Sequence, residues 1–145
     1  MFQGIDRVAI AVKDLDKAMK LFAELLDIDF DVFPKHQELG MRGAYSASGL
    51  ELIEPLGDDT MIGRFIKERG EGFWSLILKV KNMDEMIKRF EEKGIKPFNE
   101  ESFGTMREVS FHPKDTFGVE IILAEYPDKH PATAAAMNFK GPSDK

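Results

Sequence analysis

The stretch that decides the fold is VAIAVKDLD at residues 8–16, because it returns as LILKVKNMD at residues 76–84, 68 positions later. The residues after each copy keep the i, i+3, i+4, i+7 apolar spacing that lays one hydrophobic stripe along a helix. The matching positions are Leu15, Ala18, Met19 and Phe22 in the first copy and Met83, Met86, Ile87 and Phe90 in the second. Two equivalent units therefore build one domain, and we expect a functional site in the cleft that they share.

The length and composition are those of one globular domain. Of the 145 residues 43% are hydrophobic, and 12 phenylalanines supply enough apolar volume for a core. The absence of cysteine, of an apolar leader and of a long uncharged apolar run argues against disulfides, secretion and membrane spanning. The net charge of -6, with Lys and Arg scattered among Asp and Glu, offers no basic stripe for nucleic acid. We expect a cytoplasmic protein that binds neither nucleic acid nor membranes.

Apolar periodicity predicts the same order of elements in both units. In the first unit a strand over 5–13 precedes a helix that begins at an Asp14 cap and ends near Asp27, and three strands follow at 28–34, 42–48 and 50–55. In the second unit a strand over 73–81 precedes a helix over 83–93 ended by Gly94, and three strands follow at 95–99, 106–112 and 117–125. Between the units we expect a short amphipathic helix.

This order predicts an α+β fold of two tandem βαβββ modules. We expect one domain over 1–125, with the modules at 4–56 and 73–125 and the connector at 57–72. From Tyr126 onward the composition shifts to Pro, Ala, Ser and Lys without a sustained apolar period. A mobile C-terminal tail is therefore predicted over 126–145.

Four segments carry a resemblance to a known family over about residues 5–125. They are residues 8–15, the run ELIEPL at 51–56, GEG at 70–72, and HPKDT at 112–116 followed by Gly118 and Val119. Taken together they resemble the vicinal oxygen chelate superfamily, the glyoxalase, bleomycin resistance and dioxygenase group, with methylmalonyl-CoA epimerases as the most similar branch. The resemblance implies a paired-cup fold, a small-molecule ligand in the cleft and, because small two-unit members often pair, a homodimer.

Members of this superfamily usually hold a divalent metal ion between the cups, with ligands on the first and last strands of each unit. The corresponding first-strand positions are Arg7 and Ser75, where the family commonly has histidine, and the last-strand positions are Glu51 and Ile122. A lone carboxylate beside a permanent cation and an isoleucine does not make a transition-metal site. We therefore predict no metal and no other cofactor in this cleft.

Strand alternation predicts which side chains face the cleft. On the first strand it places Arg7 in the cavity, and on the first strand of the second unit it places Trp74 on the helix side, within the core. The other residues expected at the cleft are Glu51, Phe73, Ser75, Ile77, Glu120 and Ile122. We expect Phe73, Ile77 and Ile122 to contact an apolar part of the ligand.

The charged residues of the cleft suggest two kinds of role. The guanidinium of Arg7 can hold a carboxylate or a polarised carbonyl by two parallel hydrogen bonds, which replaces part of what a metal does. Alternatively, Arg7 forms an internal salt bridge to Glu51 or Glu120 that only closes the cup. Glu51 and Glu120 are candidates for moving a proton. The resemblance implies a further carboxylate before the third strand, for which Glu38 is the nearest match.

The sequence supports functions of two different classes. The first is a metal-independent enzyme, an isomerase or lyase of the epimerase and glyoxalase type, that acts on a small carboxylate or acyl thioester by proton transfer next to a carbonyl. The second is a non-catalytic protein that binds or sequesters a small molecule, as the resistance branch of the superfamily does. Proton exchange into a substrate separates the two classes.

Overall fold

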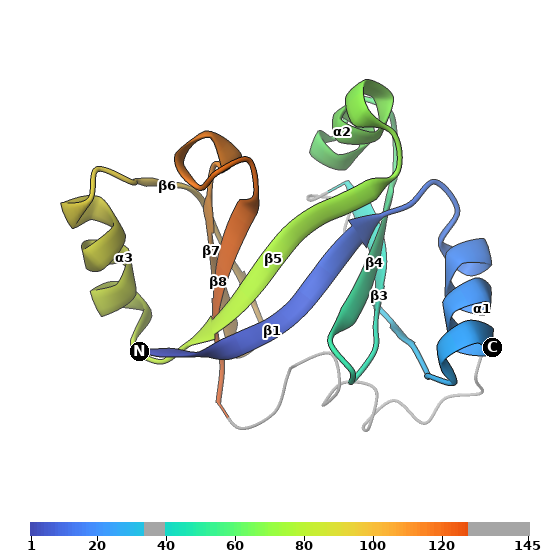
Figure 1. The fold of residues 1–145 in the computed structure, drawn as a ribbon, viewed down its shortest axis with the longest axis horizontal. Helices are drawn as coiled ribbons and strands as arrows, with labels where there is room; N and C mark the ends of the chain where they lie inside the picture. The colour runs from blue at the N-terminus through green and yellow to red at the C-terminus, as the bar shows by residue number, and fades with distance from the viewer. Residues whose placement is uncertain (34–39, 128–145) are drawn as a thin grey trace.

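The protein folds into a curled eight-stranded sheet with three helices, seen in a computed structural model that describes residues 1–33 and 40–127 (Figure 1). The first five elements are β1 (Phe2–Ala11), α1 (Leu15–Leu26), β2 (Asp31–Val32), β3 (Met41–Tyr45) and β4 (Leu50–Pro55). After α2 (Met61–Arg69) the order repeats as β5 (Gly72–Val80), α3 (Met83–Glu92), β6 (Pro97–Phe103), β7 (Met106–Phe111) and β8 (Glu120–Glu125). The predicted α+β class with its two βαβββ runs is confirmed.

Strand pairing repeats the symmetry of the sequence. The strand order is β2-β3-β4-β1-β5-β8-β7-β6, with the antiparallel pair β1 and β5 at the centre. On either side of this pair the last strand of each run lies parallel to its first, β4 beside β1 and β8 beside β5. Residues from the two ends of each run are thereby brought together: Ala9 is opposite Glu51, and Ser75 is opposite Glu120.

The two repeated helices begin with the same device. The side chains of Asp14 and Asn82 cap α1 and α3 by accepting hydrogen bonds from the backbone N–H groups of Lys17 and Glu85. A glutamate at the end of each module's last strand adds a second acceptor. Glu54 accepts from the N–H of Leu15 at 2.6 Å, and Glu125 accepts from the N–H groups of Asn82 and Met83 at 2.9 and 3.2 Å. Each module's last strand is thus tied to the positive end of its helix.

The helices divide the core between the two faces of the sheet. Leu15 of α1 packs with Val12, Ala44 and Leu52, and Met83 of α3 packs with Val80, Val109, Phe111 and Leu123. A third cluster, which includes Ile62 and Ile66 of α2 with Ala9, Ile53 and Ile77, covers part of the opposite face. In Figure 1, α1 and α3 lie at opposite sides of the molecule and α2 stands above the central strands. The face beneath α2 is the one that holds the cavity described below.

Some predicted boundaries were wrong. The strand predicted over 28–34 is reduced to β2, an edge strand that pairs with only Ala44 and Tyr45 of β3. The strand predicted over 95–99 is β6, which extends to Phe103 because it pairs with β7 along its whole length. The strand was predicted too short because residues 99–102 of β6 are all polar and show no apolar alternation. Residues 128–145, which hold most of the predicted tail, and Glu38 lie outside the described residues.

None of the three helices found within residues 1–33 and 40–127 is long and apolar enough to cross a membrane.

The helix-capping glutamates give a paired prediction. Replacing Glu54 or Glu125 by alanine removes an anionic acceptor from a helix N-terminus, so each variant should lose about 1–2 kcal/mol of unfolding free energy in urea titration. Glu24→Ala, an exposed position in α1, is the control and should change stability by less than about 0.5 kcal/mol. Wild-type stability in both capping variants would contradict this reading of the repeat.

Candidate functional site

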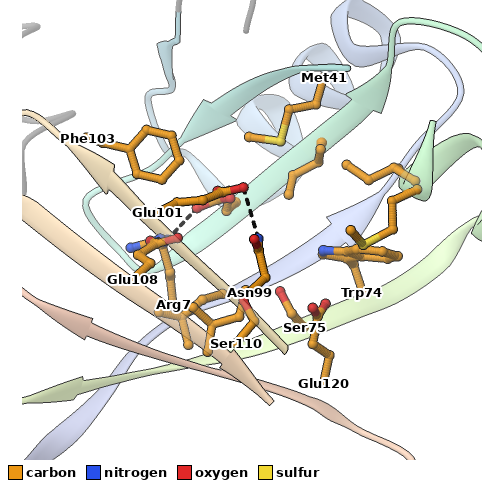
Figure 2. Close-up of a pocket in the computed structure, with 16 residues that line it drawn as sticks. Arg7, Met41, Trp74, Ser75, Asn99, Glu101, Phe103, Glu108, Ser110 and Glu120 are labelled. Atoms are coloured by element: carbon orange, nitrogen blue, oxygen red, sulfur yellow. Dashed lines mark hydrogen bonds and ion pairs between the residues drawn. The ribbon is translucent and has the colours of Figure 1, made fainter. Parts of the chain in front are cut away.

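A cavity of about 90 Å³ lies on the sheet face beneath α2 and is lined by strands of both modules (Figure 2). Its floor is polar and consists of Arg7, Glu51, Ser75, Glu108 and Glu120. Apolar side chains also line the cavity: Ile77 and Ile122, which alternate with Ser75 and Glu120 along the same two strands, and Met41, Trp74 and Phe103 around them. Pockets that enclose a whole drug-sized ligand measure about 300–1,000 Å³. This cavity therefore fits only a small end of a larger ligand.

Arg7 sits on β1 with its side chain 4% exposed, and its guanidinium is surrounded by carboxylates. Nε donates to Glu51 on β4, Nη2 donates to Glu108 on β7, and Nη1 donates to Asp6 at 2.7 Å. Burial alone would lower the pKa of Arg7, but the three carboxylates outweigh it and raise that pKa above its ordinary value. The sequence left open whether Arg7 holds a ligand or forms an internal ion pair. In the structure it forms an internal ion pair with Glu51.

Glu108 is the site residue that the sequence analysis missed. Burial raises its pKa to about 7, and the charge of Glu51 adds to that effect while Arg7 opposes it. A signal for it was present: Val109 and Phe111 on the same strand are fully buried in the α3 cluster, so alternation sends Glu108 and Ser110 to the cavity. The same argument applies to β6, where Asn99 and Glu101 line the cavity and the Asn99 amide donates to Glu101 at 2.9 Å.

Ser75 and Glu120 are cross-strand neighbours on β5 and β8. Ser75 is 0% exposed, and its hydroxyl oxygen is the one buried side-chain polar atom without a hydrogen-bond partner in the described part of the chain. Glu120 is 7% exposed, and its pKa is raised to about 7 by burial first and then by the charges of Glu101 and Glu108. A buried hydroxyl without a partner calls for an explanation, and a bound ligand or water at this point supplies one.

The expectation for Phe73 and Trp74 is corrected by the structure. Trp74 lines the cavity, with its ring 5.0 Å from that of Phe65 on α2 in a T-shaped contact, whereas Phe73 is 47% exposed and does not line it. The cause is an irregularity in the pairing of β1 with β5. Ala9 is opposite Ser75 but Ile10 is opposite Phe73, so Trp74 is an extra residue without a partner on β1. Such a bulge breaks the alternation from which the orientation was predicted.

The other predicted cleft residues surround the cavity. Arg7, Glu51, Ser75, Ile77, Glu120 and Ile122 all line it, whereas Glu38 lies outside the described residues.

The donor set does not fit the divalent metal ion that the superfamily usually holds. At the four corresponding positions stand a guanidinium, a carboxylate already paired with it, a serine hydroxyl and a hydrocarbon. A transition-metal ion needs several neutral imidazoles or anionic groups at its ligand positions, and these four positions supply one carboxylate, which Arg7 already contacts.

The titration of Glu120 predicts a pH dependence of stability. The pKa of Glu120 in the folded protein, about 7, exceeds the ordinary value of 4.5, so the folded state binds its proton more tightly than the unfolded state. The contribution of Glu120 to the unfolding free energy is therefore fully present below pH 4.5 and is lost as the pH rises through 7. Relative to Glu120→Gln, which does not titrate, the wild type should lose about 2 kcal/mol of unfolding free energy between pH 5 and pH 8. Urea titrations across this range test it, with Glu24→Gln as the exposed control. Parallel pH profiles of wild type and Glu120→Gln would contradict the burial of an ionisable group here.

Comparison with known proteins places this chain in a family. The sequence model of the glyoxalase/bleomycin resistance protein/dioxygenase superfamily matches residues 6–111. Human mitochondrial methylmalonyl-CoA epimerase is 29% identical over an alignment of 128 residues, which covers 83% of this chain and 73% of the human protein. The structure of methylmalonyl-CoA epimerase from Mycobacterium tuberculosis superposes with a TM-score of 0.79 at 29% identity and 93% coverage of both chains.

The fold also matches that of a methylmalonyl-CoA epimerase solved with a bound CoA ligand. A variant of Streptomyces coelicolor methylmalonyl-CoA epimerase in complex with 2-nitronate-propionyl-CoA superposes with a TM-score of 0.80 at 23% identity, over 88% of this chain and 100% of that one. At this identity the match shows the shared fold. The family expectation drawn from the sequence is confirmed: the chain belongs to the glyoxalase/bleomycin resistance protein/dioxygenase superfamily.

Proposed function

We propose that this protein catalyses proton transfer at the carbon next to the carbonyl of an acyl thioester, in the manner of an epimerase and without a divalent metal. The methylmalonyl-CoA epimerases among its relatives support the reaction class. The observation that carries the proposal is the pair on the cavity floor: a buried carboxylate, Glu120, directly across from the unpartnered hydroxyl of Ser75.

Glu120 is the group that removes the proton. A general base works best when its pKa lies near the operating pH, since it is then deprotonated in a large fraction of molecules and still basic enough to react. The pKa of Glu120 is raised to about 7 by burial and by Glu101 and Glu108, which meets this condition at neutral pH. An ordinary exposed glutamate is a far weaker base.

Ser75 is the group that stabilises the negative charge formed when the proton leaves. Its hydroxyl can donate to the thioester carbonyl oxygen as that oxygen becomes an enolate, and its fixed, fully buried position avoids reorganisation during the reaction. Its lack of a protein partner leaves this donor available.

Arg7 acts in this proposal by positioning carboxylates. Its contacts to Glu51 and Glu108 hold both side chains at the cavity floor, and Glu108, whose pKa is also raised to about 7, can return a proton from a second direction. The expectation that Arg7 holds a ligand carboxylate is less well supported, because its guanidinium already contacts three protein carboxylates. The roles of Glu51 and Glu38 in proton transfer, the homodimer and the cytoplasmic location stay predictions from the sequence.

Deuterium incorporation tests the proposal. In D2O the wild-type protein should exchange the proton at the second carbon of an acyl-CoA for deuterium faster than this exchange occurs in buffer without protein. Mass spectrometry of the acyl-CoA measures the deuterium incorporated. Glu120→Gln should slow exchange by about 10²–10⁴-fold, and Ser75→Ala by about 10²–10³-fold. Glu24→Gln, on the exposed face of α1, is the matched control and should keep the wild-type rate.

Two results would count against this function. Saturable binding of acyl-CoA without exchange would favour the alternative of a sequestering protein, for which the small apolar-walled cavity is also suited. Full exchange activity in Glu120→Gln would mean that another group removes the proton.

A further inference from the structure

The cavity carries a strong excess of negative charge. Arg7 is the one cationic residue among the described residues that line it. Against this single positive charge stand four glutamates from four different strands: Glu51 on β4, Glu101 on β6, Glu108 on β7 and Glu120 on β8. Asp6, which contacts Arg7, adds a fifth carboxylate. Even with Glu108 and Glu120 both protonated, the remaining carboxylates outnumber the guanidinium.

The positive charge is also confined to one side of the floor. Arg7 contacts Glu51, Glu108 and Asp6, all within its own cluster. The charges that act appreciably on Glu120 are those of Glu101 and Glu108, and both raise its pKa. In Figure 2 the side chains of Ser75 and Glu120 lie together, apart from Arg7. A ligand placed for attack by Glu120 therefore meets a negative field.

Apolar side chains line the cavity as well. In Figure 2 Trp74 lies beside Ser75 and Glu120, whereas Met41 and Phe103 border other parts of the cavity. Ile122, two residues along β8 from Glu120, also lines it. Alkyl substituents gain free energy on burial against such a surface. An ionised carboxylate placed there would lose its hydration, and the one cation among the described lining residues, Arg7, already contacts Glu51 and Glu108.

We infer that the acyl group accepted by this cavity is branched and uncharged, such as a 2-methylacyl group, and carries no carboxylate of the kind found in methylmalonyl-CoA. The inference rests on the proposed function and narrows its substrate class. In the reaction the bond between the second carbon and its hydrogen breaks, and the proton passes to the Glu120 carboxylate. The electron pair moves onto the thioester oxygen, which accepts a hydrogen bond from Ser75. Return of a proton restores the thioester, so no redox partner is needed.

A matched pair of ligands tests the inference. Isobutyryl-CoA and methylmalonyl-CoA share the thioester, the CoA carrier and one methyl branch, and they differ in that a methyl group of the first is a carboxylate in the second. Calorimetric titration at pH 8, with CoA alone as baseline, should show isobutyryl-CoA binding at least tenfold more tightly than methylmalonyl-CoA. The preference should shrink at pH 6, because protonation of Glu108 and Glu120 reduces the negative charge of the cavity.

Variants show whether the cavity charge causes the preference. Glu101→Gln removes one negative charge that is not assigned to proton transfer, so it should lower the ratio of the two affinities several-fold. Glu24→Gln leaves the ratio unchanged, because Glu24 is exposed on α1.

The outcomes separate this inference from the proposed function. Equal or tighter binding of methylmalonyl-CoA at pH 8, with exchange at its second carbon, would overturn the inference and leave the proposed function standing. If neither thioester binds better than CoA alone, no acyl group enters the cavity and both fall. Tighter binding of isobutyryl-CoA with no exchange would support the charge argument and overturn the catalytic proposal.

Discussion

The cluster of carboxylates around the buried guanidinium of Arg7 is the constraint on which the site depends. Glu51 belongs to the first module and Glu108 to the second, so this one side chain links the two halves of the sheet across the cavity. Burying a carboxylate without a partner costs several kcal/mol, and a buried ion pair is seldom better than apolar packing. The arrangement is therefore understood more easily as a means of holding carboxylates at the cavity floor than as a source of stability.

The internal repeat makes the asymmetry of the site visible. The scaffold is symmetric down to the glutamates that cap α1 and α3. At the cavity, however, Arg7 on β1 corresponds to Ser75 on β5, and Glu51 on β4 corresponds to Ile122 on β8. One half thus supplies an ion pair and the other supplies a hydroxyl and a hydrocarbon. In the proposed reaction the hydroxyl of Ser75 and the side chain of Ile122, both from the second module, contact the thioester carbonyl and the alkyl substituents of the ligand.

The sequence predicted the scaffold well because the repeat and the apolar periodicity both report on the core. Alternation on β1 likewise placed Arg7 at the cavity. It failed at Trp74, because the bulge opposite Ala9 and Ile10 depends on how two distant strands pair, and neither strand reveals that alone. Alternation on β7, where Val109 and Phe111 face the core, would also have placed Glu108 at the cavity. The pair of Arg7 with Glu51 was one of the two arrangements left open by the sequence. Its extension to Glu108 was not foreseen, because that contact joins β1 to β7 through tertiary packing.

We infer that Arg7 and its carboxylates stand where members of the superfamily usually hold a metal ion. Calorimetric titration of chelator-treated protein with cobalt, manganese and zinc tests this most directly, with Glu51→Gln titrated in parallel. We predict no stoichiometric binding to the wild-type protein, because a guanidinium and an isoleucine occupy two of the four ligand positions. Binding of one ion per chain that disappears in Glu51→Gln would contradict the account, since Glu51 would then be a metal ligand and not the partner of Arg7.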